Sequence, residues 1–194
     1  MINYPNGKKS VNKPKNTAKS TYLNKNHANR GRFLEAKISE SNDFYREQNL
    51  ALIYKRPTPI RVVEVDYTRG PKIVNAYFEK QSTTDFNGVI SGRYIDIEAK
   101  STLSKTSFPL HNISRHQIEH LRKVIICGGL AFFIIEFAYY EETYLLDAGF
   151  VINWFDNNKK RSIPYPLMKE NGHLIRQTLD APVDYLSIIL KFYL

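Results

Sequence analysis

The residues best suited to chemistry are Asp85, Glu98 and Lys100, in the stretch QSTTDFNGVISGRYIDIEAK at positions 81–100. The stretch predicts two short strands, the first carrying Thr83 and Asp85, joined by a turn at Ser91-Gly92. Side chains alternate along the second strand, so Glu98 and Lys100 are neighbours on one face and the other face is apolar. Carboxylates are oxygen ligands for Mg²⁺, which activates water and neutralises phosphate charge. A lysine can hold the attacking water or stabilise the transition state. This combination suits metal-assisted cleavage of a phosphodiester.

A Glu-x-Lys pair also occurs on ordinary solvated strands, where a surface ion pair contributes little to stability. The tripeptide alone therefore does not establish catalysis, and the rest of the chain has to decide. Asp96 shares the strand face of Glu98 and is a tempting third ligand. It lies two residues away, about 7 Å along the strand, so we expect it to have a structural or supporting role.

Composition indicates the class of protein. The 194 residues, 42% hydrophobic and 13% aromatic, fit a single globular domain. The net charge of +9 and a pI near 9.5 favour nucleic acid as the partner, before a membrane. The single cysteine excludes an intramolecular disulfide and a cysteine-rich zinc site. Because Cys127 lies in an apolar run, we expect a buried structural thiol. The N-terminus has no apolar signal core, and the longest apolar run, residues 124–135, is too short for a bilayer. The expected location is the cytoplasm.

The first 29 residues predict a basic tail. They contain no acidic residue, and eight Lys or Arg lie between Lys8 and Arg32. Such segments are usually disordered and often bind nucleic acid; the alternative is a merely solubilising leader. Residues 30–194 then form one domain. It begins with a helix whose stripe contains Phe33, Leu34 and Ile38, on which we expect Glu35 to be solvated rather than to face an active site.

A β-hairpin is predicted after a short strand at residues 51–55. Its arms, residues 60–67 and 73–80, flank Thr68-Arg69-Gly70-Pro71. Arms of this length extend roughly 25 Å. Aromatic and basic residues on such arms could stack on bases and contact phosphate, or the hairpin could be buried in the main sheet. The pattern does not choose between these two arrangements.

The second half alternates helices and strands. Ser114 is a good N-cap for a helix over residues 115–124, on which His116 and His120 lie four residues apart. Zinc binding by this pair is disfavoured because no third ligand is apparent, and a basic helix face near DNA fits better. The pattern further predicts a strand buried on both faces at Leu130–Phe137, a strand at Thr143–Leu146 and a helix capped by Asp147 that runs through Phe155. Pro164 and Pro166 exclude a regular element at their positions. Residues 173–179 are ambiguous, and residues 185–194 suit a closing strand or helix.

The order of these elements resembles that of the PD-(D/E)xK nuclease superfamily, and more narrowly the RecU family of Holliday junction resolvases. The resemblance is carried by NRGRFLE at 29–35, VDYTRG at 65–70, YFEKQSTTDFNG at 77–88 and Ile97-Glu98-Ala99-Lys100. It covers nearly the whole chain from about residue 29. Thr84 precedes Asp85 where the superfamily pattern has proline, which is normal for RecU-like sequences.

The resemblance implies an α/β fold of the restriction-endonuclease type, with a mixed central sheet flanked by helices and a protruding hairpin stalk at about residues 60–80. It also implies a Mg²⁺-dependent, dimeric endonuclease, with Mn²⁺ as a substitute metal, that nicks four-way DNA junctions symmetrically in recombination and repair. The family is associated with modulation of the RecA recombinase. By position, Thr83, Asp85, Glu98 and Gln117 correspond to the metal site, and Lys100 to the lysine that stabilises the transition state.

Physical considerations agree with this assignment. Mg²⁺ keeps several waters, so two carboxylates with neutral oxygens from Thr83 and Gln117 suffice. Two cuts in one nearly two-fold junction require a two-fold dimer, for which the apolar face of the hairpin and the helix around Phe33 are candidate interfaces. The candidate DNA contacts are Arg69, Lys72, Tyr77, Phe78, Lys80, Arg93 and Arg115. The alternatives are a related nuclease that cuts linear duplex and a non-catalytic DNA-binding scaffold.

Overall fold

The computed structural model describes residues 27–79 and 83–194. The expected tail, residues 1–29, lies outside them except for its last three residues, with which helix α2 (His27–Glu47) begins. A six-stranded mixed sheet has the order β1-β4-β5-β7-β8-β10, and β5 and β7 are parallel neighbours within it. Its strands are β1 (Leu52–Lys55), β4 (Phe86–Ile90), β5 (Arg93–Thr102), β7 (Leu130–Phe137), β8 (Glu142–Asp147) and β10 (Gly172–Leu174).

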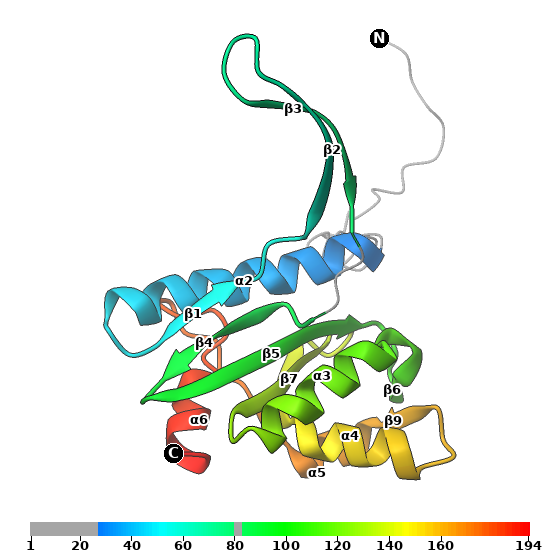
Figure 1. Ribbon diagram of the computed structural model, residues 1–194. Coiled ribbons are helices and arrows are strands. Elements are labelled where there is room, and N and C mark those ends of the chain that lie inside the picture. The colour runs from blue at the N-terminus through cyan, green and yellow to red at the C-terminus, as the bar shows by residue number, and fades with distance from the viewer. Residues whose placement is uncertain (1–26, 80–82) are drawn as a thin grey trace, which may run out of the picture.

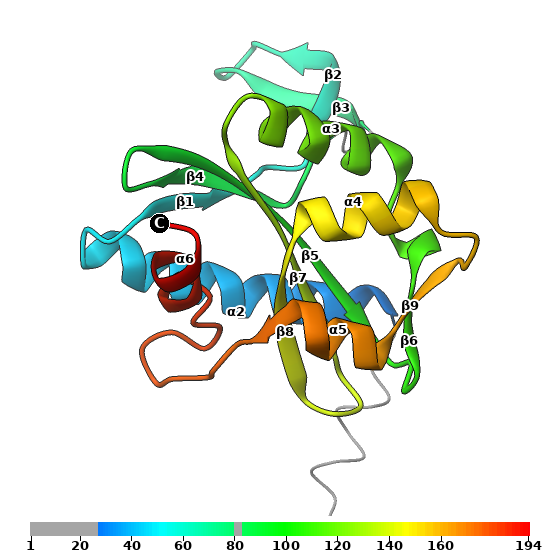
Figure 2. The same ribbon diagram turned by 90° about the horizontal axis from the view of Figure 1, so that it is seen from below.

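Helices cover both faces of this sheet (Figures 1 and 2). The helices α2 (His27–Glu47) and α6 (Leu186–Phe192) pack on one face, and α3 (Arg115–Ile126), α4 (Ala148–Asn157) and α5 (Tyr165–Asn171) pack on the other. A small sheet of β6 (Ser107–Pro109) and β9 (Ser162–Pro164) and the 3-10 turn η1 (Leu110–Asn112) lie beside α3 and α4. The expected α/β architecture, a mixed sheet between helices, is confirmed.

The alternation of side chains along β5 creates two hydrophobic cores. Ile95, Ile97 and Ala99 belong to the core under α2 and α6, whereas the opposite face of β5 carries Asp96, Glu98 and Lys100 toward α3. All eight residues of β7 are buried, as expected for a strand covered on both faces. The polar face of β5 therefore lies against a helix rather than in open solvent.

The hairpin of β4 and β5 brings the candidate acids together. Its turn is at Ser91-Gly92, as predicted, and both residues have positive φ, 46° and 75°. Antiparallel pairing places Phe86 opposite Ile97, which brings Asp85 to the level of Glu98. Asp85 and Thr83 precede β4, which begins only at Phe86, so they lie on a loop rather than on the strand that was expected.

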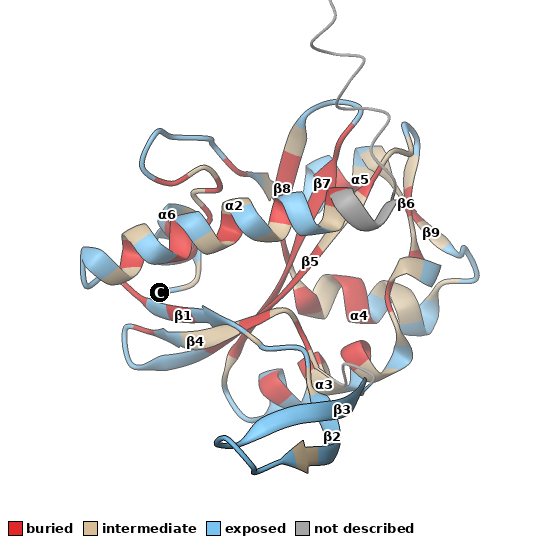
Figure 3. Cartoon of the chain, turned by 90° about the horizontal axis from the view of Figure 1, so that it is seen from above, coloured by how far each residue is buried: buried red, intermediate tan, exposed pale blue. Residues whose placement is uncertain are grey.

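The predicted hairpin forms a stalk outside the central sheet. Its arms, β2 (Ile60–Asp66) and β3 (Lys72–Phe78), pair only with each other, and nearly every residue is exposed. Figure 1 shows the stalk projecting from the body, and Figure 3 shows its exposed surface. The backbone N–H of Glu79 donates to the Pro59 carbonyl at 2.9 Å and closes its root. The structure thus selects the projecting arrangement.

Two sequence-based expectations about local structure are wrong. Cys127 is exposed, because α3 continues to Ile126 and turns only Val124 of this run into the core. Regular structure also occurs at both prolines. Pro164 ends the short strand β9, and Pro166 is in the first turn of α5, where a helix needs no backbone N–H.

The other expectations of elements hold. Asp147 caps α4 by accepting from the Gly149 N–H at 2.7 Å. The segment at residues 185–194, expected as a strand or a helix, contains the helix α6 (Leu186–Phe192). Within the described part of the chain, no helix is both long and apolar enough to cross a membrane.

Gly88 is the tightest point between β1 and β4. A Cβ atom there would lie 2.0 Å from the Leu52 carbonyl oxygen and 2.6 Å from the Ile53 Cα, both backbone atoms. We expect Gly88→Ala to lower the free energy of unfolding by at least about 2 kcal/mol, as measured by urea denaturation. Gly31→Ala is the control, because its Cβ would have room on α2 and alanine favours a helix by up to about 1 kcal/mol. Equal stability of the two variants would contradict this account of the β1–β4 contact.

Candidate active site

Glu98 is the most deeply buried acid of the candidate set. It lies in the middle of β5, and only 1% of its surface is exposed. Its Oε1 atom accepts from Lys100 Nζ at 2.7 Å and from Gln117 Nε2 at 2.6 Å. Its Oε2 atom is buried without a hydrogen-bond partner. A buried carboxylate oxygen without a donor is costly, so this atom has the capacity to bind a cation.

Asp85 lies on the loop before β4 and faces the same region. Its Oδ2 atom accepts from the Ala99 N–H at 2.9 Å. Burial raises the pKa of Asp85, and the negative charge of Glu35 adds to the increase, whereas the Ala99 N–H and Lys100 act against it. Asp85 is therefore an acid whose charge the fold compensates only in part.

The charge of Asp85 acts on Glu98. Burial raises the pKa of Glu98 from 4.5 to about 8, and the negative charge of Asp85 contributes to that increase. Lys100 and Gln117 oppose it. Two carboxylates in a site of low polarity disfavour each other's ionisation, and a divalent cation between them would relieve both effects.

The residues present fit a metal with few protein ligands. Among the residues that the structure describes, no three His, Cys, Asp or Glu side chains converge into a metal cage. Asp85 and Glu98 instead provide two carboxylates beside Lys100. The Oε2 atom of Glu98 has no hydrogen-bond partner. Mg²⁺ is commonly held by one or two carboxylates and retains several waters.

The two neutral residues of the predicted metal site differ in their placement. Gln117 lies against Glu98, but its Oε1 atom accepts from the Ser114 N–H at 3.1 Å as part of the helix cap. An amide oxygen engaged in this way would have to exchange that bond to bind a metal. Thr83 lies two residues before Asp85 and is partly exposed, and its role as a ligand stays a prediction.

Glu35 is nearer to the site than the sequence suggested. Its side chain is only 23% exposed and forms an ion pair with Lys55 at 2.8 Å, and its charge acts on Asp85. The expectation of a solvated glutamate is therefore wrong. The available signal was its position next to Leu34, at the edge of the buried stripe of α2.

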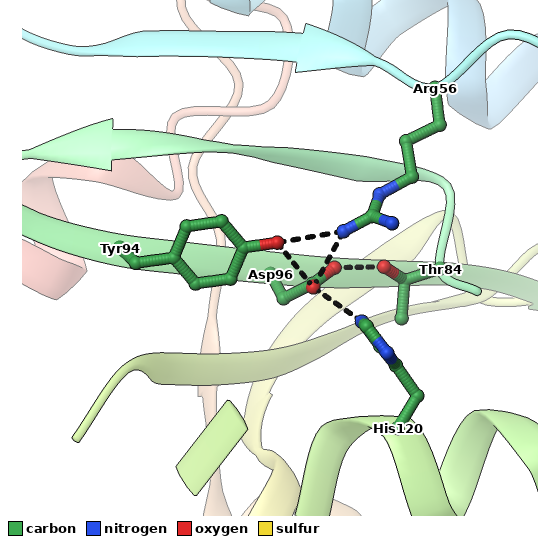
Figure 4. Close-up of polar contacts among 5 residues, drawn as sticks. All are labelled: Arg56, Thr84, Tyr94, Asp96 and His120. Carbon is green, nitrogen blue, oxygen red and sulfur yellow. Dashed lines mark hydrogen bonds and ion pairs between the residues drawn. The ribbon is translucent and has the colours of Figure 1, made fainter. Parts of the chain in front are cut away.

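A second polar cluster surrounds Asp96, which is fully buried. Its Oδ2 atom lies 2.9 Å from Arg56 Nη2, 2.9 Å from the Tyr94 hydroxyl and 2.7 Å from His120 Nε2. Thr84 donates its hydroxyl to Oδ1, as Figure 4 shows. With three partners on Oδ2 and the Thr84 hydroxyl on Oδ1, the Asp96 carboxylate is engaged by the protein itself, which disfavours it as a metal ligand. Of this cluster, the sequence analysis had considered Asp96 and His120 as possible ligands and had noted Thr84 only as the residue in place of the superfamily's proline.

The two histidines of α3 do not form a pair. His120 contacts Asp96, whereas His116 Nε2 lies 3.0 Å from the Ser114 hydroxyl. These different partners argue against a zinc ion shared by the two histidines. The sequence analysis had also disfavoured such a site.

The candidate DNA contacts separate into three groups. Arg69, Lys72, Tyr77 and Phe78 are exposed on the stalk, and Lys80 lies outside the described residues. Arg115 begins α3, two residues from Gln117, and its side chain is 87% exposed. Arg93 is at the opposite end of β5 from Lys100, where it donates to the carbonyls of Gly128 and Tyr193. The structure does not bring Arg93 to the carboxylates.

Comparison with known proteins finds one matching family and several similar chains. The family described as RecU, Recombination protein U, matches residues 29–191. A protein of Geobacillus kaustophilus named Holliday junction resolvase RecU is 41% identical, over 99% of this chain and 98% of its own length. One with the same name from Oceanobacillus iheyensis is 43% identical, over 99% of this chain and all of its own length. The solved Archaeoglobus fulgidus Hjc, a Holliday junction resolvase, aligns with 68% of this chain and 90% of its own at a TM-score of 0.40 and 10% identity.

The raised pKa of Glu98 predicts a pH-dependent stability when metal is removed. The pKa of Glu98 is higher in the folded than in the unfolded chain, so the protonated Glu98 carboxyl stabilises the folded state. This contribution is fully present below pH 4.5 and is lost as the pH rises through about 8. Glutamine at position 98 does not titrate. In a chelating buffer, the free energy of unfolding of Glu98→Gln relative to wild type should therefore be higher at about pH 9 than at about pH 5, by on the order of a few kcal/mol. Urea denaturation at both pH values measures this gain.

Glu119→Gln is the matched control for this experiment, because Glu119 is a half-exposed residue on α3. Its stability relative to wild type should not change between the two pH values. A constant difference between Glu98→Gln and wild type would contradict the assigned burial of the Glu98 carboxylate.

Proposed function

The chain belongs to the RecU family, and from this membership we propose that it is a Mg²⁺-dependent endonuclease that resolves four-way DNA junctions by paired, symmetric nicks. The observation that carries the proposal is the buried site of Asp85, Glu98 and Lys100, in which Glu98 Oε2 has no partner. A solvated surface pair would not leave a carboxylate oxygen buried and unsatisfied. The proposed setting is recombination and repair of DNA in the cytoplasm.

In this proposal the chain's own residues hold and orient the reacting groups. Asp85 and Glu98 would hold the metal, which supplies charge neutralisation and an activated water when bound. Thr83 would be a further ligand of the metal. Gln117 would be another, once its Oε1 atom has given up the hydrogen bond from the Ser114 N–H. Lys100 Nζ, 2.7 Å from Glu98 Oε1, would donate to the attacking water or to a phosphate oxygen. Mn²⁺ has similar ligand preferences and should substitute.

The stalk supplies the selectivity for junctions in this proposal. It carries exposed Arg69 and Lys72 near its tip and exposed Tyr77 and Phe78 near its root. Cations contact phosphates, and aromatic rings stack on unpaired bases. A linear duplex offers no central opening for such a projection, whereas a four-way junction does.

Two cuts related by symmetry require two active sites, so we propose a homodimer with two-fold symmetry. The stalk exposes a set of apolar side chains that a second copy could cover: Ile60, Val62, Val63, Ile73 and Val74. Phe33 on α2, which is 38% exposed, is the other candidate contact. Contact with the RecA recombinase is a further proposal that rests on the family resemblance, and the exposed tip residues Arg69 and Lys72 are the place to seek it.

Removal of one metal ligand tests the proposed chemistry. Even residues that only support metal ligands contribute 10–100-fold, so Asp85→Asn should slow nicking of a synthetic four-way junction by at least about 100-fold. Junction binding in Ca²⁺ or chelator should stay close to wild type. The control is Asp156→Asn, because Asp156 is an exposed acid on α4 paired with Arg122. Nicking by Asp85→Asn at the rate of the control would reject the mechanism.

Shortening the stalk separates a resolvase from a nuclease for linear duplex. Val62 and Ala76 are register partners, so residues 63–75 can be replaced by Asn-Gly, which favours a tight hairpin turn. We expect this variant to keep its fold and its metal site but to lose its preference for junction over duplex in competition binding and in nicking. If wild type itself nicks duplex as fast as junction, or the shortened variant retains full preference, the role of the stalk in selectivity is excluded.

A further inference from the structure

We propose that Thr84 and Asp96 form a positioning device for the metal site: Asp96 holds the Thr84 hydroxyl and thereby fixes the loop that presents Asp85. This inference deepens the proposed function, because it concerns the same site. Neither residue would touch metal or DNA. Their contribution is to place the Asp85 carboxylate relative to Glu98.

The need for such a device follows from the position of Asp85. It lies just before the first residue of β4, at the end of the strand ladder. Its Oδ2 atom is held by the Ala99 N–H at 2.9 Å, and its carbonyl accepts from the Arg56 N–H at 2.8 Å. On its N-terminal side the adjacent Thr84 is fully buried and donates to Asp96. The loop is therefore attached to the sheet on both sides of Asp85.

Asp96 is a rigid point of attachment. It is fully buried, and its partners come from the loop before β4, from the residue after β1, from β5 and from α3. Figure 4 shows the four side chains converging on this carboxylate. A buried charge with several charged and neutral hydrogen bonds costs much to displace. Movement of Asp96 would break contacts to several elements at once.

Arg56 connects this device to the root of the stalk. Its Nη2 atom contacts both Asp96 and the Tyr94 hydroxyl, at 2.9 and 2.7 Å, and its backbone N–H holds Asp85. Arg56 is also the residue after β1 from which residues 57–59 lead into the stalk. The stalk root and the Asp85 loop therefore depend on the same carboxylate. The stalk, proposed to contact DNA, and Asp85, proposed to hold the metal, are thus supported by one residue.

The expected size of the effect follows from the tolerance of metal sites. Ligands must be held within about 0.5 Å of their productive positions, and residues that orient ligands typically contribute 10–100-fold to metal affinity or activity. Loss of the Thr84 hydroxyl leaves Asp96 with its other partners and releases only the loop. The predicted result is weaker metal binding without loss of the fold.

The test compares two substitutions of Thr84, one that removes the hydroxyl group and one that removes the methyl group. Thr84→Val keeps the volume and removes the hydroxyl, whereas Thr84→Ser keeps the hydroxyl and removes the methyl group. Binding of Mn²⁺ in the absence of DNA is measured by the paramagnetic resonance of the free ion. Thr84→Val should bind Mn²⁺ on the order of 10-fold more weakly than wild type, and Thr84→Ser should stay close to wild type. Thermal melting of each variant, without metal, reports the cost to the fold.

Thr143→Val controls for the burial of a valine in place of a threonine, because Thr143 is a buried residue on β8, away from the site. It should match Thr84→Val in melting temperature to within a few degrees and bind Mn²⁺ like wild type. Equal Mn²⁺ affinity of Thr84→Val and Thr143→Val overturns the inference, as does equal weakening by Thr84→Val and Thr84→Ser.

Asp85→Asn separates this inference from the proposed function. If it abolishes Mn²⁺ binding while wild type fails to nick a junction, the positioning role stands and the proposed activity falls. If Asp85→Asn binds Mn²⁺ like wild type, Asp85 is not a ligand and the positioning role is overturned with it.

Discussion

The burial of two carboxylates beside each other is the constraint on which this structure depends. Glu98 lies within the sheet under α3, and Asp85 is brought to its level by the β4–β5 hairpin. Both are desolvated, and the negative charge of Asp85 further disfavours ionisation of Glu98. Lys100 and Gln117 compensate only one oxygen of Glu98. The fold thus holds an incomplete charge arrangement, and a divalent cation is the species that would complete it.

Asp96 and Glu98 show how the same residue type on one strand face can have two different roles. Both oxygens of Asp96 have partners, which come from four segments of the chain, so it is held as a fixed support. Glu98 keeps an unpartnered oxygen and is available for binding. Alternation along the strand cannot distinguish the two acids, because it gives both the same orientation. The difference arises from the number of donors that the tertiary fold places around each carboxylate.

Features encoded by local pattern could be predicted from the sequence. These include the alternation of β5, the turn at Ser91-Gly92, the cap at Ser114 and the buried strand β7. The family motifs identified Asp85, Glu98 and Lys100 as the site to examine. The end of α3 was placed too early because an apolar run does not show where helical periodicity stops, and this error led to the wrong environment for Cys127. Contacts of Arg56 and His120 with Asp96 join residues 40 and 24 positions apart, and no local rule encodes such meetings.

The isolation of the stalk from the central sheet has a thermodynamic consequence. A two-stranded ribbon with nearly all of its side chains in solvent gains little from burial and is marginally stable by itself. In the proposed function, docking of the stalk on a DNA branch point or on a second copy would supply further order. Part of the free energy of recognition is then spent on ordering the ribbon. Under that proposal the affinity would be lowered by this amount, and the ordering of the ribbon would contribute to selectivity together with its contacts.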